Sequence, residues 1–258
     1  MKKIAKYVDV WRFIKIYGAD RTGTNFTSWM LSHNFNEVIV LQNMLGSKHG
    51  APNKPFDYLL EEWRKKNGDI YRNDKHGGLQ CHPWNIHVNV IKKAIAKKKL
   101  KFVITFREPY NWVARFSWYY SKPRPEKITD NMDRVEQAVK KRFNPIYSQC
   151  LDNLKDEDTI FLKLDYFTKN QVIILDRIQQ KFNLTRANYI SPLKRFGAGF
   201  DHKLRMAKES VEQMKKMKVF KTELSKRCIE YVDKNLDWNV YRQMEQKFTN
   251  FLTGGGEK

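Results

Sequence analysis

Four short runs of β-branched and aromatic residues constrain the fold of this chain more than any other feature of its sequence. Each has the length and composition of a strand, and they occupy residues 12–18, 37–42, 101–106 and 159–164. Longer stretches with apolar residues at helical spacing lie between and after them, over residues 24–32, 56–66, 85–98, 110–120, 133–154 and 171–182. Strands that alternate with helices predict an α/β fold, with a central, mostly parallel sheet flanked by helices.

The last part of the chain has a different pattern. From residue 204 onward the apolar positions keep helical spacing, so we expect a helical C-terminal region. No internal repeat and no Ser/Gly-rich linker divides the 258 residues. We therefore predict a single domain over residues 1–252, followed by a flexible tail at residues 253–258.

The charge of the chain predicts an anionic ligand. Its 49 Lys and Arg residues exceed its 28 Asp and Glu residues, which gives a formal net charge of +21. A field of that size attracts nucleotides, acidic glycans and nucleic acids alike, so charge does not choose among them. An alternative is that lysine-rich runs such as residues 92–101 serve only to hydrate helix surfaces.

Membrane insertion and secretion are not expected. The apolar runs are far shorter than the roughly 18 residues needed to cross a bilayer, and charged residues interrupt the segment behind the N-terminal lysines. The three cysteines, Cys81, Cys150 and Cys228, show neither a CxxC motif nor metal-ligand spacing. They predict free thiols in a cytoplasmic protein without a metal site.

The most informative segment is residues 12–33, in which a strand runs into a glycine-bearing turn and then a helix. Gly23 lets the backbone approach a ligand closely, the amides at the helix start carry the positive end of its dipole, and Arg21 adds a cation. The groups expected to bind a phosphate-sized anion belong to Arg21, Thr22, Gly23, Thr24, Asn25 and Phe26. Taken alone, the same residues would equally suit a helix cap without a ligand.

This turn also differs from an ATP-binding loop. Gly18 and Gly23 match the GxxxxG of a P-loop, but the next residues are Thr24 and Asn25, where Lys and Ser or Thr are required. Without that lysine and hydroxyl, the usual machinery of nucleoside triphosphate transfer is incomplete. A kinase with an atypical P-loop is therefore kept only as an alternative.

Residues 101–121 repeat the plan of a strand followed by a helix. Arg107 stands at the carboxyl end of the expected strand and Pro109 near the start of the helix. Ligands of open α/β sheets bind at this edge, and a guanidinium can grip a phosphate with two hydrogen bonds. Arg115 or Ser117, further along the helix, can reach the same face. The alternative is that Arg107 only pairs with a neighbouring carboxylate.

The two segments together resemble the sulfotransferases that use 3′-phosphoadenosine 5′-phosphosulfate (PAPS). DRTGTNFTSWML (20–31) is similar to the family's 5′-phosphosulfate loop, and REPYNWVARFSWYY (107–120) to its 3′-phosphate segment. LGSKHGAP (45–52) resembles a Lys-His-Gly element of microbial-type members, and TIFLKLDYF (159–167) the family's late strand and acidic-aromatic turn. The resemblance implies a P-loop-like α/β fold and a metal-independent enzyme.

One departure from the family pattern concerns the serine that meets the 3′-phosphate. In the common pattern it lies eight residues after the arginine, a position that Arg115 holds here, while Ser117 lies ten residues after Arg107. Either residue is a candidate for contacting the 3′-phosphate, and the sequence does not choose between them.

The resemblance also implies catalytic roles. Arg21 stands where the family often has a lysine that contacts the leaving oxygens, and a histidine that titrates near neutrality suits the role of base. His49 is the first choice, beside Lys48, whose charge would stabilise the sulfuryl oxygens. His82 comes next and His76 third. For each of them a purely structural role is an equal alternative.

The expected function is the transfer of a sulfuryl group from PAPS to a hydroxyl or amine acceptor, with 3′-phosphoadenosine 5′-phosphate as the product. The charge mildly favours an acidic acceptor such as a glycan. An alternative from another class is a non-catalytic nucleic-acid or polyanion-binding protein on the same fold, which the charge and Trp118, Tyr119 and Tyr120 would suit.

Overall fold

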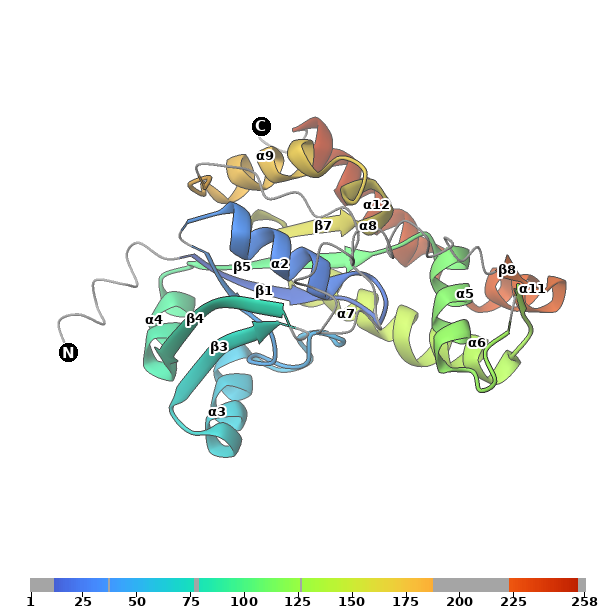
Figure 1. Cartoon of the computed structure of the whole chain (residues 1–258), viewed down its shortest axis with the longest axis horizontal. Helices are drawn as coiled ribbons and strands as arrows, with labels where there is room; N and C mark the ends of the chain where they lie inside the picture. The colour runs from blue at the N-terminus through green and yellow to red at the C-terminus, as the bar shows by residue number, and fades with distance from the viewer. Residues whose placement is uncertain (1–11, 37, 77–78, 126, 188–222, 255–258) are drawn as a thin grey trace, which may run out of the picture.

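A parallel sheet forms the centre of the protein (Figure 1). The computed structural model describes residues 12–36, 38–76, 79–125, 127–187 and 223–254, with the backbone alone for those of residues 72–84 that it includes. Within these ranges the sheet has the order β2-β1-β5-β7. Its strands are β1 (Arg12–Tyr17), β2 (Val38–Leu41), β5 (Leu100–Phe106) and β7 (Thr159–Lys163). The predicted strands and their parallel arrangement are confirmed.

Strand β1 is hydrogen-bonded along both of its edges. Ile14 is in register with Val40 of β2 on one side and with Lys101 of β5 on the other. Residues 13–17 and 38–41 are buried throughout, because helices and loops cover the sheet. This burial on both faces explains why the strands read as continuous apolar runs and show little alternation with polar residues.

The strand order creates a reversal between β1 and β5. The chain leaves β1 through α2 (Thr24–Asn34) toward β2, whereas β5 and β7 lie on the other side of β1. The connections that follow β1 and β5 therefore diverge at the carboxyl edge of the sheet. Ligands of open α/β folds bind at such a switch point.

The remaining helices flank the sheet and form the C-terminal region. α12 packs along β7 and against α7. The helical C-terminal region is confirmed for residues 226–253, while residues 204–222 lie outside the described part. The bounds of these helices are α3 (Phe56–Asn67), α4 (Val88–Ala96), α5 (Pro109–Tyr120), α6 (Met132–Ala138), α7 (Asn144–Asn153), α8 (Leu164–Phe167), α9 (Gln171–Phe182), α11 (Lys226–Asn235) and α12 (Trp238–Thr253).

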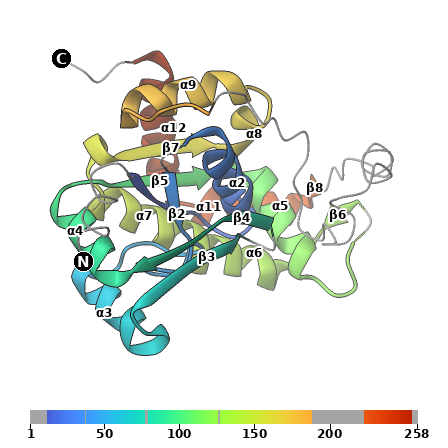
Figure 2. The same cartoon turned by 60° about the vertical axis from the view of Figure 1, so that its left-hand side comes forward.

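The prediction of a helix over residues 85–98 is wrong at its start. β4 (Leu79–His87) pairs with β3 (Ile70–His76) in an antiparallel hairpin that lies against α2 (Figure 2). Tyr71 is in register with Ile86, and both are buried. This pairing across the hairpin overrides the helical spacing of residues 85–87, and α4 starts only at Val88. His87 then caps α4 by accepting a hydrogen bond from the amide of Asn89 (3.2 Å).

Two smaller differences concern the later part of the chain. The predicted helix over residues 133–154 is nearly continuous, but a π-helical turn, Val139–Phe143, separates α6 from α7. Pro145, at the start of α7, has no amide hydrogen to continue the regular pattern. The sequence analysis also missed the short parallel pair β6 (Ile128–Thr129) and β8 (Glu223–Leu224).

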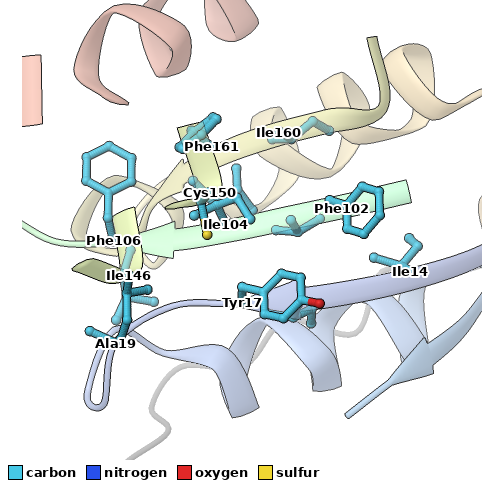
Figure 3. Packing of buried hydrophobic residues seen from close by; sticks show 14 of the residues in the cluster. Ile14, Tyr17, Ala19, Phe102, Ile104, Phe106, Ile146, Cys150, Ile160 and Phe161 are labelled. Atoms are coloured by element: carbon cyan, nitrogen blue, oxygen red, sulfur yellow. The ribbon is translucent and has the colours of Figure 1, made fainter. Parts of the chain in front are cut away.

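Part of the core lies between the sheet and α7 (Figure 3). Aromatic and β-branched side chains from β1, β5 and β7 meet Ile146 and Cys150 of α7 there. Cys150 and Cys228 are buried free thiols, whereas Cys81 belongs to the stretch whose side chains are outside the described part. No helix in the described ranges has both the length and the apolar character required to span a membrane.

Candidate functional site

The loop after β1 is held tightly against its neighbours. A Cβ on Gly18 would lie 2.5 Å from the backbone oxygen of Thr105 in β5, so only glycine fits there. The buried hydroxyl of Thr22 donates to the carbonyl of Ala19 (2.7 Å) and lies 2.9 Å from the hydroxyl of Thr105. Gly23 has a φ of +88°, and a Cβ there would overlap the side chain of Leu164. Both glycines of the predicted turn are therefore required by geometry.

Helix α2 begins at this loop with its amides directed away from the helix body. The first backbone bond of the helix runs from the amide of Thr27 to the carbonyl of Gly23 (2.9 Å). The amides of Thr24, Asn25 and Phe26 precede that bond and have no carbonyl partner within the helix. No side chain in the described part caps this end. The arrangement offers several donors and a positive dipole end to an anion.

Arg21 lies beside the helix start with its charge against an aromatic ring. Its backbone has a φ of +71°, and its guanidinium carbon lies 3.1 Å from the centre of the Tyr119 ring. Its Nε is buried and makes no hydrogen bond with any described residue. A buried donor without a partner costs free energy, and a bound anion would supply the missing acceptor.

Asp20 lies between the imidazole of His49 and the guanidinium of Arg142. Its carboxylate lies 3.8 Å from Nε2 of His49 and 3.7 Å from Nε of Arg142. The indole of Trp112 donates to the backbone oxygen of Asp20 (2.6 Å). The position of this carboxylate removes the conflict that a free acidic side chain would create at an anion site.

The loop after β2 brings Lys48 and His49 to the same place. The ammonium of Lys48 donates to Oδ1 of Asn25 (2.5 Å) and to Oε1 of Gln42 (3.0 Å). His49 lies beside Asp20. The structure thus brings together two predicted segments, one with Arg21 and Asn25 and the other with Lys48 and His49.

The surroundings of His49 favour its neutral form. Burial lowers its pKa most strongly, and the charges of Lys48 and Arg21 lower it further, while Asp20 opposes them. The pKa therefore lies below the ordinary value of 6.5. A neutral imidazole at pH 7 can accept a proton, which is the chemistry required of a general base.

Two side chains of β1 that the sequence analysis missed hold the loop after β2 in place. Lys15 is fully buried in β1, and its ammonium donates to the carbonyls of Gln42 and Gly46, each at 2.6 Å. Tyr17, on the same face of β1, donates to the carbonyl of Leu45. Burial, aided by the charge of Lys48, lowers the pKa of Lys15 well below 10.5. A lysine in the middle of an apolar strand was the available signal.

Arg107, the phosphate contact predicted at the end of β5, is paired with a carboxylate. We call it the second anchor, and Arg21 the first. Nη2 of Arg107 donates to Oδ1 of Asp165, and its Nε lies 3.3 Å from Oδ2. Burial raises the pKa of Asp165, but the bonds and charge of Arg107 outweigh it, helped by Arg115 and Lys163. The pKa of Asp165 stays below 3.8. Arg107 therefore does pair with a carboxylate, as the alternative interpretation proposed.

Arg115 and Ser117 lie in different environments on α5. Arg115 is exposed, and its charge acts on Asp165 together with that of Arg107. Ser117 is fully buried, and its hydroxyl lies 2.9 Å from that of Thr129 in β6. The structure brings Arg115 toward the Arg107 anchor and leaves Ser117 in the packing between α5 and β6.

The other two candidate bases cannot be placed in the site. His82 lies in β4 and His76 in β3, and their side chains are outside the described part. Within the described ranges, no group of three His, Cys, Asp or Glu side chains is arranged to hold a metal ion.

Comparison with known proteins adds no family to this geometry. No protein-family model, no curated protein and no solved structure matches the chain. The site therefore has to be interpreted from its own chemistry. It has cationic anchors at the carboxyl ends of β1 and β5, and a histidine of lowered pKa between Asp20 and Lys48.

The close approach of Gly23 to Leu164 predicts a cost for a single added methyl group. Gly23→Ala should lower the free energy of unfolding by about 3 kcal/mol, because a left-handed backbone and an overpacked contact add. Gly254→Ala is the matched control, since Gly254 has a similar backbone (φ +72°, ψ 11°) with no contact closer than 3.6 Å. It should cost about 1 kcal/mol in urea unfolding. Equal costs would contradict the tight contact.

The lowered pKa of His49 predicts a loss of stability on acidification. As pH falls through about 6.5, His49 of the unfolded chain binds a proton that the folded protein resists, so the free energy of unfolding decreases. His49→Gln should remove this part of the decrease between pH 7.5 and 5.5, measured by urea unfolding. His87→Asn, which keeps a capping side chain on α4, controls for the loss of an imidazole. An unchanged pH dependence in His49→Gln would contradict the assignment.

The buried ammonium of Lys15 predicts a specific effect on the loop it holds. Lys15→Met keeps the length of the side chain but leaves the carbonyls of Gln42 and Gly46 without their donor, which should cost about 2–4 kcal/mol. Amide hydrogen exchange should then accelerate in residues 42–50 more than in β5. Exchange that accelerates equally in both segments would contradict a local anchoring role.

Proposed function

We propose that the protein is a PAPS-dependent sulfotransferase of the P-loop-like α/β type, acting on a hydroxyl or amine acceptor. One observation carries the proposal. Three of the four stretches that resemble the family follow β1, β2 and β5, which are neighbours in the sheet, and their charged residues lie at its carboxyl edge. Lys48 of the second stretch is bonded directly to Asn25 of the first. Such convergence of distant segments is typical of a ligand site.

The residues present suit the two anionic ends of PAPS. The amides of residues 24–26 and the partnerless Nε of Arg21 would hold the 5′-phosphosulfate, since both lack an acceptor within the described part. Arg107 and Arg115 would hold the 3′-phosphate. Gly18 and Gly23 keep the loop close to β5 and α8, which leaves its amides toward the ligand.

The chain's own groups then perform the proton and charge chemistry. When bound, PAPS would supply the sulfuryl group, whose bond to the phosphate oxygen breaks as the bond to the acceptor forms. His49 accepts the proton of the acceptor, and Asp20 stabilises the imidazolium. Lys48 stabilises oxygens that gain negative charge. Arg21 does the same for the leaving phosphate but cannot donate a proton.

A second candidate function has an observation of its own. The guanidinium of Arg124 lies 4.8 Å from the ring centre of Trp118 and 5.3 Å from that of Tyr119, which also stacks on Arg21. Partly exposed rings between cations suit the bases and phosphates of single-stranded nucleic acid. A non-catalytic polyanion-binding protein is therefore the alternative. In the sulfotransferase proposal the same surface suits an acidic glycan as acceptor.

Calorimetric titration with 3′-phosphoadenosine 5′-phosphate, without metal, tests the proposal. We expect micromolar affinity, weakened about tenfold or more in Arg107→Ala and in Arg21→Ala, because each removes a charged phosphate contact. AMP, which lacks the 3′-phosphate, should bind weakly and be insensitive to Arg107→Ala. Arg64→Ala, on the exposed face of α3, removes an equal charge and should leave the affinity unchanged.

Two outcomes would overturn the proposal. A preference for ATP with Mg²⁺ would point to an atypical P-loop kinase. Tight, steeply salt-dependent binding of RNA without affinity for the bisphosphate would point to the polyanion-binding alternative. Transfer of sulfate from PAPS that survives both arginine substitutions would show that the site is elsewhere.

A further inference from the structure

The most informative contact outside the loop between β1 and α2 is the pairing of Arg107 with Asp165. The guanidinium side chain is only 11% exposed, and two of its nitrogens face the two carboxylate oxygens. This forked geometry is the one by which arginine grips a phosphate. In the free protein, Asp165 therefore uses the hydrogen-bonding groups that an anionic ligand of Arg107 would need.

The position of Asp165 is fixed by the turn that carries it. Lys163, the last residue of β7, is in register with Phe106, which directly precedes Arg107. Leu164 packs against the backbone of Gly23, and the ring of Phe167 meets that of Phe26 at 5.1 Å. The short helix α8 thus contacts the start of α2 and holds Arg107 at the same time.

The charges around Asp165 match those of an anion site. Arg107, Arg115 and Lys163 all act on this carboxylate, and they come from three different positions at the sheet edge. Lys163 also pairs with Glu245 of α12 (2.5 Å), so part of its charge is already balanced. Arg107 and Arg115 are the cations that we expect an anion to contact, and Asp165 lies in the fork of Arg107.

We propose that Asp165 is an internal stand-in for the phosphate at this anchor: its carboxylate occupies the fork of Arg107 in the free protein and yields it when an anion binds. The identity of the anion as a nucleotide 3′-phosphate rests on the proposed function. The competition itself requires only that Arg107 is an anion site.

The competition sets a threshold for binding at Arg107. Every anion has to displace the carboxylate, so Asp165 lowers the affinity of inorganic phosphate and of a larger ligand by the same factor. A ligand that is also anchored at the start of α2 reaches Arg107 at a high effective concentration and can displace the carboxylate. Inorganic phosphate has no second contact to offset the lost ion pair, so the threshold excludes it at concentrations at which a ligand with two anionic groups binds.

The experiment compares Asp165→Asn with the wild-type protein by calorimetry. Asparagine keeps the shape and an accepting oxygen but removes the charge. We expect inorganic phosphate and 3′-phosphoadenosine 5′-phosphate each to bind about tenfold more tightly, while AMP is unchanged. The gain should disappear in the double variant Asp165→Asn with Arg107→Ala.

Asp158→Asn is the matched control. Asp158 pairs with Lys101 (2.5 Å) and thereby links the same two strands, β5 and β7, at their opposite end. The substitution Asp158→Asn removes the same charge without touching Arg107, and so should leave phosphate affinity unchanged. Asp165→Ser gives the same measurement should the asparagine variant fail to fold, which thermal unfolding reports.

The outcomes separate this inference from the proposed function. Unchanged or weaker phosphate binding in both Asp165→Asn and Asp165→Ser would overturn the role of Asp165. An equal gain in phosphate affinity in Asp158→Asn would overturn it as well. If the bisphosphate fails to bind the wild-type protein while phosphate still gains affinity through Arg107, the proposed function fails and the competition stands.

Discussion

The pairing of β1 along both edges is the constraint on which the rest of the structure depends. Its register with β2 and β5 places the loops that follow all three strands at one edge of the sheet. Lys15 extends this control beyond the backbone, because its ammonium binds two carbonyls of the loop after β2. Burying an amine is costly unless its donors are satisfied, so the loop and the strand stabilise each other. Lys48 and His49 owe their positions to that arrangement.

Each cationic anchor is accompanied by a carboxylate. Asp20 lies between His49 and Arg142 near the first anchor, and Asp165 grips Arg107 at the second. Half-buried cations that repel one another would destabilise the free protein, and these carboxylates reduce that repulsion. The two differ in consequence. Asp20 lies beside the candidate base and modifies its proton affinity, whereas Asp165 occupies the hydrogen-bonding groups of the anchor itself.

The sequence predicted those features that depend on local composition. Continuous apolar runs identified the four buried strands, and the glycine turn before α2 identified the candidate anion-binding loop, since the positive φ of Gly23 is a local property of the chain. The contacts with Thr105 and Leu164 that exclude a side chain at Gly18 and Gly23 come from distant segments. The hairpin of residues 70–87 was missed because its pairing partners, not its spacing, decide the conformation. The partner of Arg107 lies 58 residues away in α8, directly after β7, and no local pattern indicates which carboxylate the sheet register will bring to it. Lys15 was visible in the sequence as a charged residue within an apolar strand. Its two acceptors could not be predicted, because they belong to the loop after β2.

The geometry of α5 distinguishes the two residues that could contact the 3′-phosphate in the proposed function. Successive helical residues turn by about 100°, so residues two apart point in nearly opposite directions. Ser117 is buried against β6, whereas Arg115 is exposed and its charge acts on Asp165. In the proposed function, Arg115 would share the anion site with Arg107. An arginine there supplies a full charge where a serine would supply a hydroxyl, and this additional charge gives the carboxylate of Asp165 a second cation to balance.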